Sequence, residues 1–213
     1  MTKINKIPQA VIQFMSIFAA YFVVRLFVFS SVIGSHTACF SASNIVMPVV
    51  STGIDGFIGL LITLVLHSIY FVTTQHVASS LLLICHIPQL FASGMMLVHN
   101  SVAKAFFFLC AIFLFIVHPV GSVAWIYPCL WLIPMVSLLW AGTKIERALT
   151  ATFAAHVVGS LIYLYAIPMT AAQWVGLVPV VLVERGVFAL GIVGLLYAQE
   201  VVTHVYKSRM VAR

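Results

Sequence analysis

The segment "AFFFLCAIFLFIV" (residues 105–117) is an uninterrupted run of apolar side chains. It lacks the alternation of lipid-facing and inward-facing residues that marks the strands of a membrane barrel. A backbone surrounded by apolar groups satisfies its own hydrogen bonds most simply as a helix. This stretch therefore predicts an α-helix with an apolar environment on every side.

The whole chain shares this character. Of its 213 residues, 63% are hydrophobic and only 7% are charged, and the mean hydropathy is +1.19. About a quarter of the residues of an ordinary soluble domain are charged, so the composition excludes that class. We predict an all-α protein, a polytopic transmembrane helical bundle in which residues 1–213 form a single integral membrane domain.

A transmembrane helix needs about 20 apolar residues, and windows of this kind cover most of the chain. They lie at residues 9–33, 55–74, 77–98, 102–118, 122–141, 148–167 and 172–199. The stretch 41–56 is mixed and contains Pro48, Gly53 and Gly56, so we expect a structured loop or a half-buried entry segment there.

Basic residues in short loops mark the cytoplasmic face, so the loop 142–147, with a lysine and an arginine, is predicted to lie inside. Seven crossings would then put the N-terminal Lys3 and Lys6 outside. We therefore favour six spans with both termini in the cytoplasm, with seven as the alternative. In the six-span arrangement residues 102–141 form one span plus a re-entrant or tilted piece, and Lys104 lies on the outer face.

The formal net charge is +6, from ten basic and four acidic residues. The chain shows no basic cluster with interleaved aromatic residues, so no nucleic-acid interface is predicted. The basic residues near the two ends suit anchors at a membrane face better. We expect the chain in the cytoplasmic membrane of a bacterium or an archaeon, with the lipid bilayer as its surroundings.

The stretch "LVERGVFALG" (182–191) places two charges inside an apolar run. A charge at the centre of a membrane helix costs about 2.5–3.5 kcal/mol, so such residues are expected in pairs. Four charges lie inside predicted spans or at their edges: Arg25, Asp55, Glu184 and Arg185. Adjacent helix residues point about 100° apart, so we pair Glu184 with Arg25, and Arg185 with Asp55.

Other uses of these charges remain open. Asp55 could cap a helix, and Arg25 could extend toward the membrane surface. Gly191 and Gly194 share a helix face with Glu184, and small residues let another helix approach, so we expect that face to be packed inward. A purely structural ion pair and a site that handles a ligand or a proton are equal alternatives.

Two further residues indicate a binding site. His156 lies on a stripe formed with Thr152, Gly159 and Tyr163, which recur at helical spacing. Trp131 lies deep in an apolar segment, where an interfacial aromatic belt explains it poorly. We predict a substrate pocket lined by Arg25, Trp131, His156, Glu184 and Arg185. An interhelical hydrogen bond is the alternative for His156, and a belt with kinks at nearby prolines is the alternative for Trp131.

The eight histidines and four cysteines show no metal-site spacing such as His-x-x-x-His or Cys-x-x-Cys. We therefore expect no metal and no cofactor. The chain also lacks a P-loop pattern. If it moves a molecule, it needs a partner or an ion gradient to drive the movement.

The pieces "FASGMM" (91–96) and "AAHVVG" (154–159) resemble the active-site motifs of rhomboid intramembrane serine proteases. In that family a serine before a glycine is the nucleophile, and a histidine in an Ala-His-x-x-Gly setting is the base. The resemblance would make Ser93 and His156 a catalytic dyad. The chain departs from the family at Phe91, where the family has glycine, and the likeness covers about ten residues.

The stretches "NIVMPVVSTGIDGFIGLL" (44–61) and "AAQWVGLVPVVLVERGVFALG" (171–191), with the size of the chain, resemble S-components of energy-coupling-factor vitamin transporters. The resemblance implies six helices, a small-molecule ligand, and a transmembrane coupling subunit and ATPases as partners. We therefore expect a substrate-binding subunit that binds or transports a small molecule through a central polar pocket, and not an enzyme. An intramembrane hydrolase of the rhomboid type and a structural or assembly subunit are the alternatives.

Overall fold

The computed structural model describes residues 28–31, 39–41, 43–53 and 80–211, together with a few isolated positions between 58 and 69. Nearly all of these residues are helical, which confirms the all-α class for the described part of the chain. The exception is a short antiparallel pair of strands, β1 (Val28–Ser31) and β2 (Cys39–Ser41). The apolar window 9–33 predicted a helix where β1 lies, because a short apolar run fits either structure.

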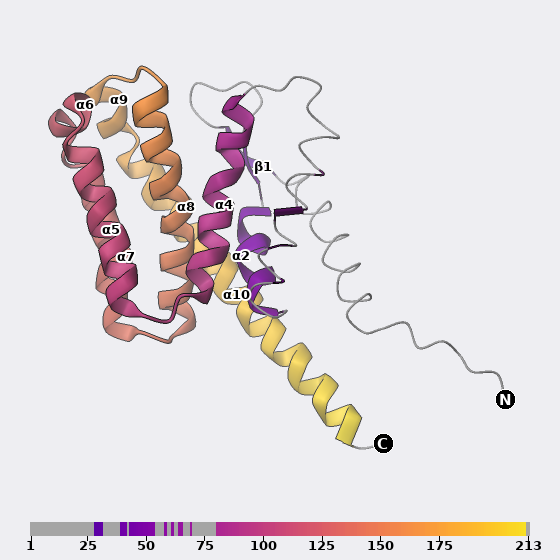
Figure 1. Ribbon diagram of the computed structural model, residues 1–213. Coiled ribbons are helices and arrows are strands. Elements are labelled where there is room, and N and C mark those ends of the chain that lie inside the picture. Colours follow the sequence, from indigo (N-terminus) through magenta and orange to yellow (C-terminus); the bar gives the residue numbers. More distant parts are fainter. Residues whose placement is uncertain are drawn as a thin grey trace.

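Four long helices in the described part of the chain form the bundle. They are α4 (Ser80–Leu97), α5 (Ser101–Ile116), α8 (Lys144–Ala166) and α10 (Val178–Val211). Helices α4 and α10 run in the direction opposite to α5 and α8 (Figure 1). Between α5 and α8 the chain turns back through α6 (Pro119–Val123), η1 (Pro128–Trp131), α7 (Leu132–Ser137) and η2 (Leu138–Trp140). The short α9 (Ala171–Gly176) lies at the same end of the bundle as α6.

Helix α8 is the centre of the bundle and packs against α2, α4, α5, α7 and α10. Its buried residues include Ala148, Ala151, Ala154 and Ala155. Small side chains allow neighbouring helices to approach closely. The helix begins where the Thr143 hydroxyl accepts a hydrogen bond from the backbone of Glu146, at 3.2 Å, which satisfies one of the free N–H groups of the first turn.

The mixed stretch 41–56 forms a helix over part of its length, α2 (Ser43–Gly53). Met47 and Val49 are buried, and α2 packs against α4 and α10. We predicted a structured loop or a half-buried entry segment. Over these residues the loop was wrong, because they are helical, and the partial burial was confirmed. Pro48 lies in the middle of the helix, and this proline led us to predict a loop.

Two helices have the length and hydropathy to cross a membrane, Lys144–Ala166 and Val178–Val202. The other apolar helices in the described residues are shorter, and the predicted count of six or seven spans is not supported by helix length. Helix α5 has 16 residues, which span about 24 Å. The window 122–141 is divided into 3-10 and α-helical pieces, because its two prolines interrupt regular hydrogen bonding.

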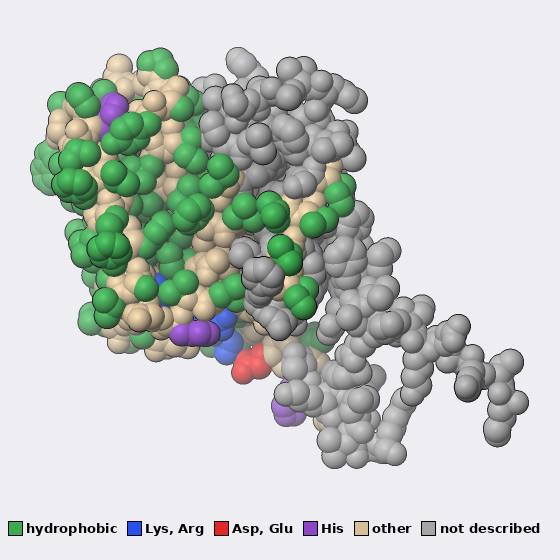
Figure 2. Space-filling model, viewed as in Figure 1, with side chains coloured by type: hydrophobic (Ala, Val, Ile, Leu, Met, Phe, Trp, Pro, Cys, Tyr) green, Lys and Arg blue, Asp and Glu red, His purple; other side chains and the backbone are tan. Residues whose placement is uncertain are grey.

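Apolar side chains are spread over the described helices on the face of the bundle seen in Figure 2. On α5 the side chains of Val102, Phe106 and Phe113 are 76%, 66% and 66% exposed, and on α10 Val183 and Leu190 are 68% and 74% exposed. Large continuous apolar surfaces of this kind are unusual on soluble monomers. The bundle therefore has the surface of a protein that faces an apolar solvent.

Residues 102–141 form a hairpin and do not run from one end of the bundle to the other. The Lys104 ammonium lies 2.7 Å from a Glu146 carboxylate oxygen, and both side chains are buried. Lys104 and the loop 142–147 therefore share one end, and our placement of Lys104 on the opposite face was wrong. The reason is the tight "HPVG" turn (118–121), after which the chain returns alongside α5.

The close approach of α2 to α10 depends on Gly191. A Cβ atom there would lie 2.7 Å from Cδ1 and 2.8 Å from Cγ2 of Ile45. A Cβ at Gly194 would have no described atom within 4 Å. The predicted inward packing of this face of α10 is thus seen at Gly191 and not at Gly194.

We expect Gly191→Ala to lower the free energy of unfolding by about 1–3 kcal/mol, because the added methyl group overpacks the contact with Ile45. Gly194→Ala is the matched control and should leave stability unchanged or raise it by about 1 kcal/mol, since alanine favours helices. Thermal unfolding in detergent measures both. Equal stabilities of the two variants would contradict the packing.

Candidate functional site

A row of polar side chains on α8 lies inside the bundle. Thr152, His156 and Ser160 are spaced four residues apart, so they share one face of the helix. The Tyr127 hydroxyl, just before η1, lies 3.1 Å from His156 Nε2 and 3.0 Å from the Ser160 hydroxyl. Sequence spacing found Thr152 and His156. It missed Ser160, which is one turn from His156, and Tyr127, whose partner lies on another element.

Arg185 connects this row to α10. Its guanidinium donates to the backbone carbonyl of Thr152 at 3.3 Å and to the Thr152 hydroxyl at 3.4 Å. We call Tyr127, Thr152, His156, Ser160, Glu184 and Arg185 the polar core.

The two adjacent charges of α10 contact each other, which corrects our expectation that they face apart. Arg185 Nη2 lies 3.6 Å from Glu184 Oε2, a distance for an ion pair and too long for a good hydrogen bond. The two side chains leave the helix about 100° apart, but both are long enough for their charged ends to meet. The predicted partners Arg25 and Asp55 lie outside the described residues.

Aromatic rings enclose the Tyr127 side of the polar core. Phe115 stacks on Tyr127 with ring centroids 5.3 Å apart, and Trp174 meets Tyr127 edge-on at 4.8 Å. Trp131 meets Phe115 edge-on at 5.4 Å. Trp131 is completely buried, whereas Trp125 is 61% exposed. Trp131 thus belongs to an internal aromatic wall and contacts the polar core through Tyr127.

Two hydrogen-bond donors of this wall have no partner. The indole Nε1 atoms of Trp131 and Trp174 are buried, and neither donates a hydrogen bond to any described residue. Buried polar groups without a partner are rare in folded proteins. The wall therefore contains two buried indole donors without a partner among the described residues, and sequence reasoning missed Trp174.

Ser93 and His156 have different partners. The Ser93 hydroxyl is buried and donates to the Met47 carbonyl at 3.3 Å, whereas His156 bonds to Tyr127. Within the described residues no hydrogen bond joins Ser93 to His156. The described part of the chain also contains no group of three His, Cys, Asp or Glu side chains able to hold a metal ion.

The described residues thus form a helical bundle with an apolar exterior and a polar core in its interior. Comparison of the chain with models of protein families, with curated proteins and with solved structures finds no match.

Proposed function

We propose that the chain is an integral membrane protein that binds a small polar molecule at the polar core, as the substrate-binding subunit of a larger transporter. The observation that carries the proposal is the polar core itself. Arg185 is buried among apolar helices and bonded to α8. Ionisable residues inside a membrane are expensive and usually functional.

The charges of the bundle support an orientation in the membrane. Lys104, Lys144 and Arg147 lie at one end of the bundle, together with Glu200, and α10 continues from that end to Lys207 and Arg209. The positive-inside rule places this end in the cytoplasm. The two helices long enough to cross a membrane, Lys144–Ala166 and Val178–Val202, would then run outward and inward, respectively.

The chemistry of the polar core suits a ligand with both polar and flat apolar parts. Arg185 presents a planar set of donors that matches a carboxylate. Tyr127, His156 and Ser160 each offer a group that donates or accepts, depending on the ligand. The aromatic wall provides a surface for a ring. Pockets with mostly apolar walls and a few directed polar groups are the usual form of small-molecule sites.

We expect one or more members of a library of vitamins, amino acids and nucleobases to raise the melting temperature of the purified protein. A ligand at 100 times its dissociation constant stabilises by about 2.7 kcal/mol. His156→Gln and Arg185→Lys should reduce this stabilisation, because each removes a hydrogen bond to the ligand. His99→Gln is the matched control, because His99 is exposed at the far end of α4. A ligand effect equal in all three variants would contradict binding at the polar core.

The transporter part of the proposal has its own test. The chain reconstituted alone in liposomes should bind the radiolabelled ligand without accumulating it, because it has no P-loop to use ATP. Accumulation by the chain alone against a concentration gradient, with no ion gradient, would contradict the subunit role and leave the binding role intact.

A further inference from the structure

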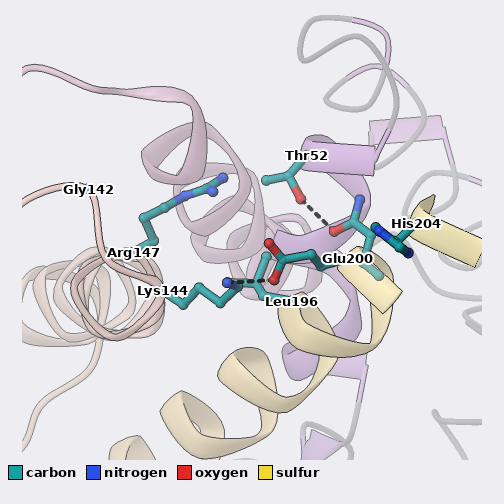
Figure 3. A pocket seen from close by; sticks show the side chains of 8 residues that line it. Thr52, Gly142, Lys144, Arg147, Leu196, Glu200 and His204 are labelled. Carbon is teal, nitrogen blue, oxygen red and sulfur yellow. Dashed lines mark hydrogen bonds and ion pairs between the residues drawn. The ribbon is translucent and has the colours of Figure 1, made fainter. Parts of the chain in front are cut away.

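A cavity lies at the charged end of the bundle, where the start of α8 meets α10 and α2 (Figure 3). Its volume is about 500 Å³, within the range of about 300–1,000 Å³ typical of small-molecule sites. Its polar lining comes from Thr52, Lys144, Arg147, Gln199, Glu200 and His204. We call this cavity the end pocket. Gln199 lies 14 residues beyond Arg185 on α10, which is about 21 Å along the helix, so the end pocket is separate from the polar core.

Arg147, one of the cations that line the end pocket, has hydrogen-bond donors without a partner among the described residues. Its Nη2 donates to the Met96 carbonyl at 3.4 Å, and its Nε is buried without a partner. In the described part of the chain no carboxylate forms an ion pair with it. In Figure 3 its guanidinium extends from α8 toward Thr52 and the α10 side of the pocket. A guanidinium has five donors in a fixed planar fork, so most of them are available to a ligand.

Lys144, the second cation that lines the end pocket, forms an ion pair with an exposed carboxylate. It lies 2.8 Å from Glu200, whose side chain is 65% exposed, and 4.2 Å from the centre of the Tyr197 ring. An exposed ion pair of this kind contributes little to stability. When an anion enters the pocket, the exposed Glu200 side chain can rotate toward the solvent. The ammonium of Lys144 is then free to pair with that anion.

The start of α8 adds to the positive potential of the end pocket. Gly142 and Lys144 line the cavity, and α8 is a helix of 23 residues that begins at Lys144. The N-terminus of a helix carries a partial positive charge of roughly half a unit. A guanidinium, an ammonium and a helix N-terminus therefore converge on one cavity.

We propose that the end pocket binds a phosphate group. Arginine binds phosphate through two parallel hydrogen bonds, and lysine contributes a point charge. The volume of the cavity accommodates an organic group attached to the phosphate. Two sources have this chemistry: the headgroup of an anionic phospholipid, because basic pockets at the cytoplasmic side of membrane helices bind such headgroups, and a soluble phosphate ester. The site does not depend on the function proposed for the polar core.

The test uses the full chain, purified in a zwitterionic detergent without added lipid. In one arm, inorganic phosphate and glycerol phosphate are titrated, and binding is followed by calorimetry. In the other arm, the protein is placed in nanodiscs of phosphatidylcholine with or without phosphatidylglycerol, and retained lipid is identified by native mass spectrometry. Binding in the first arm identifies a soluble ester, and selective retention of phosphatidylglycerol in the second identifies a lipid headgroup. Either result supports a phosphate site.

Three variants assign the binding to the end pocket. Arg147→Gln should weaken it by about tenfold or more, since hydrogen bonds to a charged group are the strong ones. Lys144→Met should weaken it less, and Glu200→Gln should strengthen it by removing a competing carboxylate. His99→Gln, at the same end and outside the pocket, should change nothing. Absence of binding in both arms, or binding that Arg147→Gln and Glu200→Gln leave unchanged, would overturn the proposal.

Discussion

Glu146→Gln is expected to lower the free energy of unfolding by about 3–5 kcal/mol, because it leaves the ammonium of Lys104 buried without a counter-ion. The two charged atoms are 2.7 Å apart, and the side chains are 4% and 3% exposed. Glu146 also accepts from the Gly142 backbone at 3.3 Å and from the Thr150 hydroxyl at 3.5 Å. The pair thus ties α5 to the start of α8 and fixes the loop between α7 and α8.

The matched control is Glu200→Gln, which breaks the exposed ion pair with Lys144. This change should alter stability by at most about 1 kcal/mol. The double variant Lys104→Met, Glu146→Leu removes both charges and should recover most of the loss, because apolar residues can replace a buried ion pair. Unfolding by a denaturing detergent measures all three. A Glu146→Gln protein as stable as Glu200→Gln would contradict the buried pair.

Gly121→Ala is expected to destabilise the bundle by at least about 3 kcal/mol, at or above the upper end of the range for overpacked sites. A Cβ atom at this position would overlap the carbonyl oxygen of Phe115, which is a backbone atom and cannot rotate away. The turn would have to open. Phe115 stacks on Tyr127, so ligand binding at the polar core should weaken as well.

Gly176→Ala serves as the control for this variant. Gly176 ends another short helix near the same end of the bundle, and a Cβ there would meet no described atom within 4 Å. The Gly176→Ala variant should be as stable as the unmodified chain. Thermal unfolding, followed by circular dichroism in detergent, compares the two variants. A Gly121→Ala protein with an unchanged melting temperature would show that α6 does not pack on α5 in this way.

Apolar windows predicted α4, α5 and α8 well, because the hydropathy of a segment is a local property. The window 148–167 corresponds to α8, and the window 102–118 corresponds to α5. The window 122–141 was recognised as distorted, because prolines act within one turn of their own position. The hairpin at 102–141 was contained in the seven-span alternative but was not favoured, because its evidence is the contact between Lys104 and Glu146, which are 42 residues apart.

Some residues of the polar core were likewise predictable from local sequence patterns, and others were not. Thr152 and His156 were found by helical spacing, and Arg185 by its position in an apolar run. The contact of Tyr127 with His156 links separate elements, so no spacing rule finds it. The end pocket was missed for another reason. Lys144 and Arg147 were interpreted as markers of membrane orientation, and the structure shows that they also line a cavity.

The bond from Arg185 to Thr152 has a consequence for biosynthesis. The guanidinium of the last helix reaches these acceptors only after α8 has taken its place, and ribosomal synthesis delivers the two helices in that order. Before the two helices meet, the counter-ion of Arg185 is Glu184, its neighbour on the same helix. Packing of α10 against α8 therefore completes this part of the interior after α8 has formed.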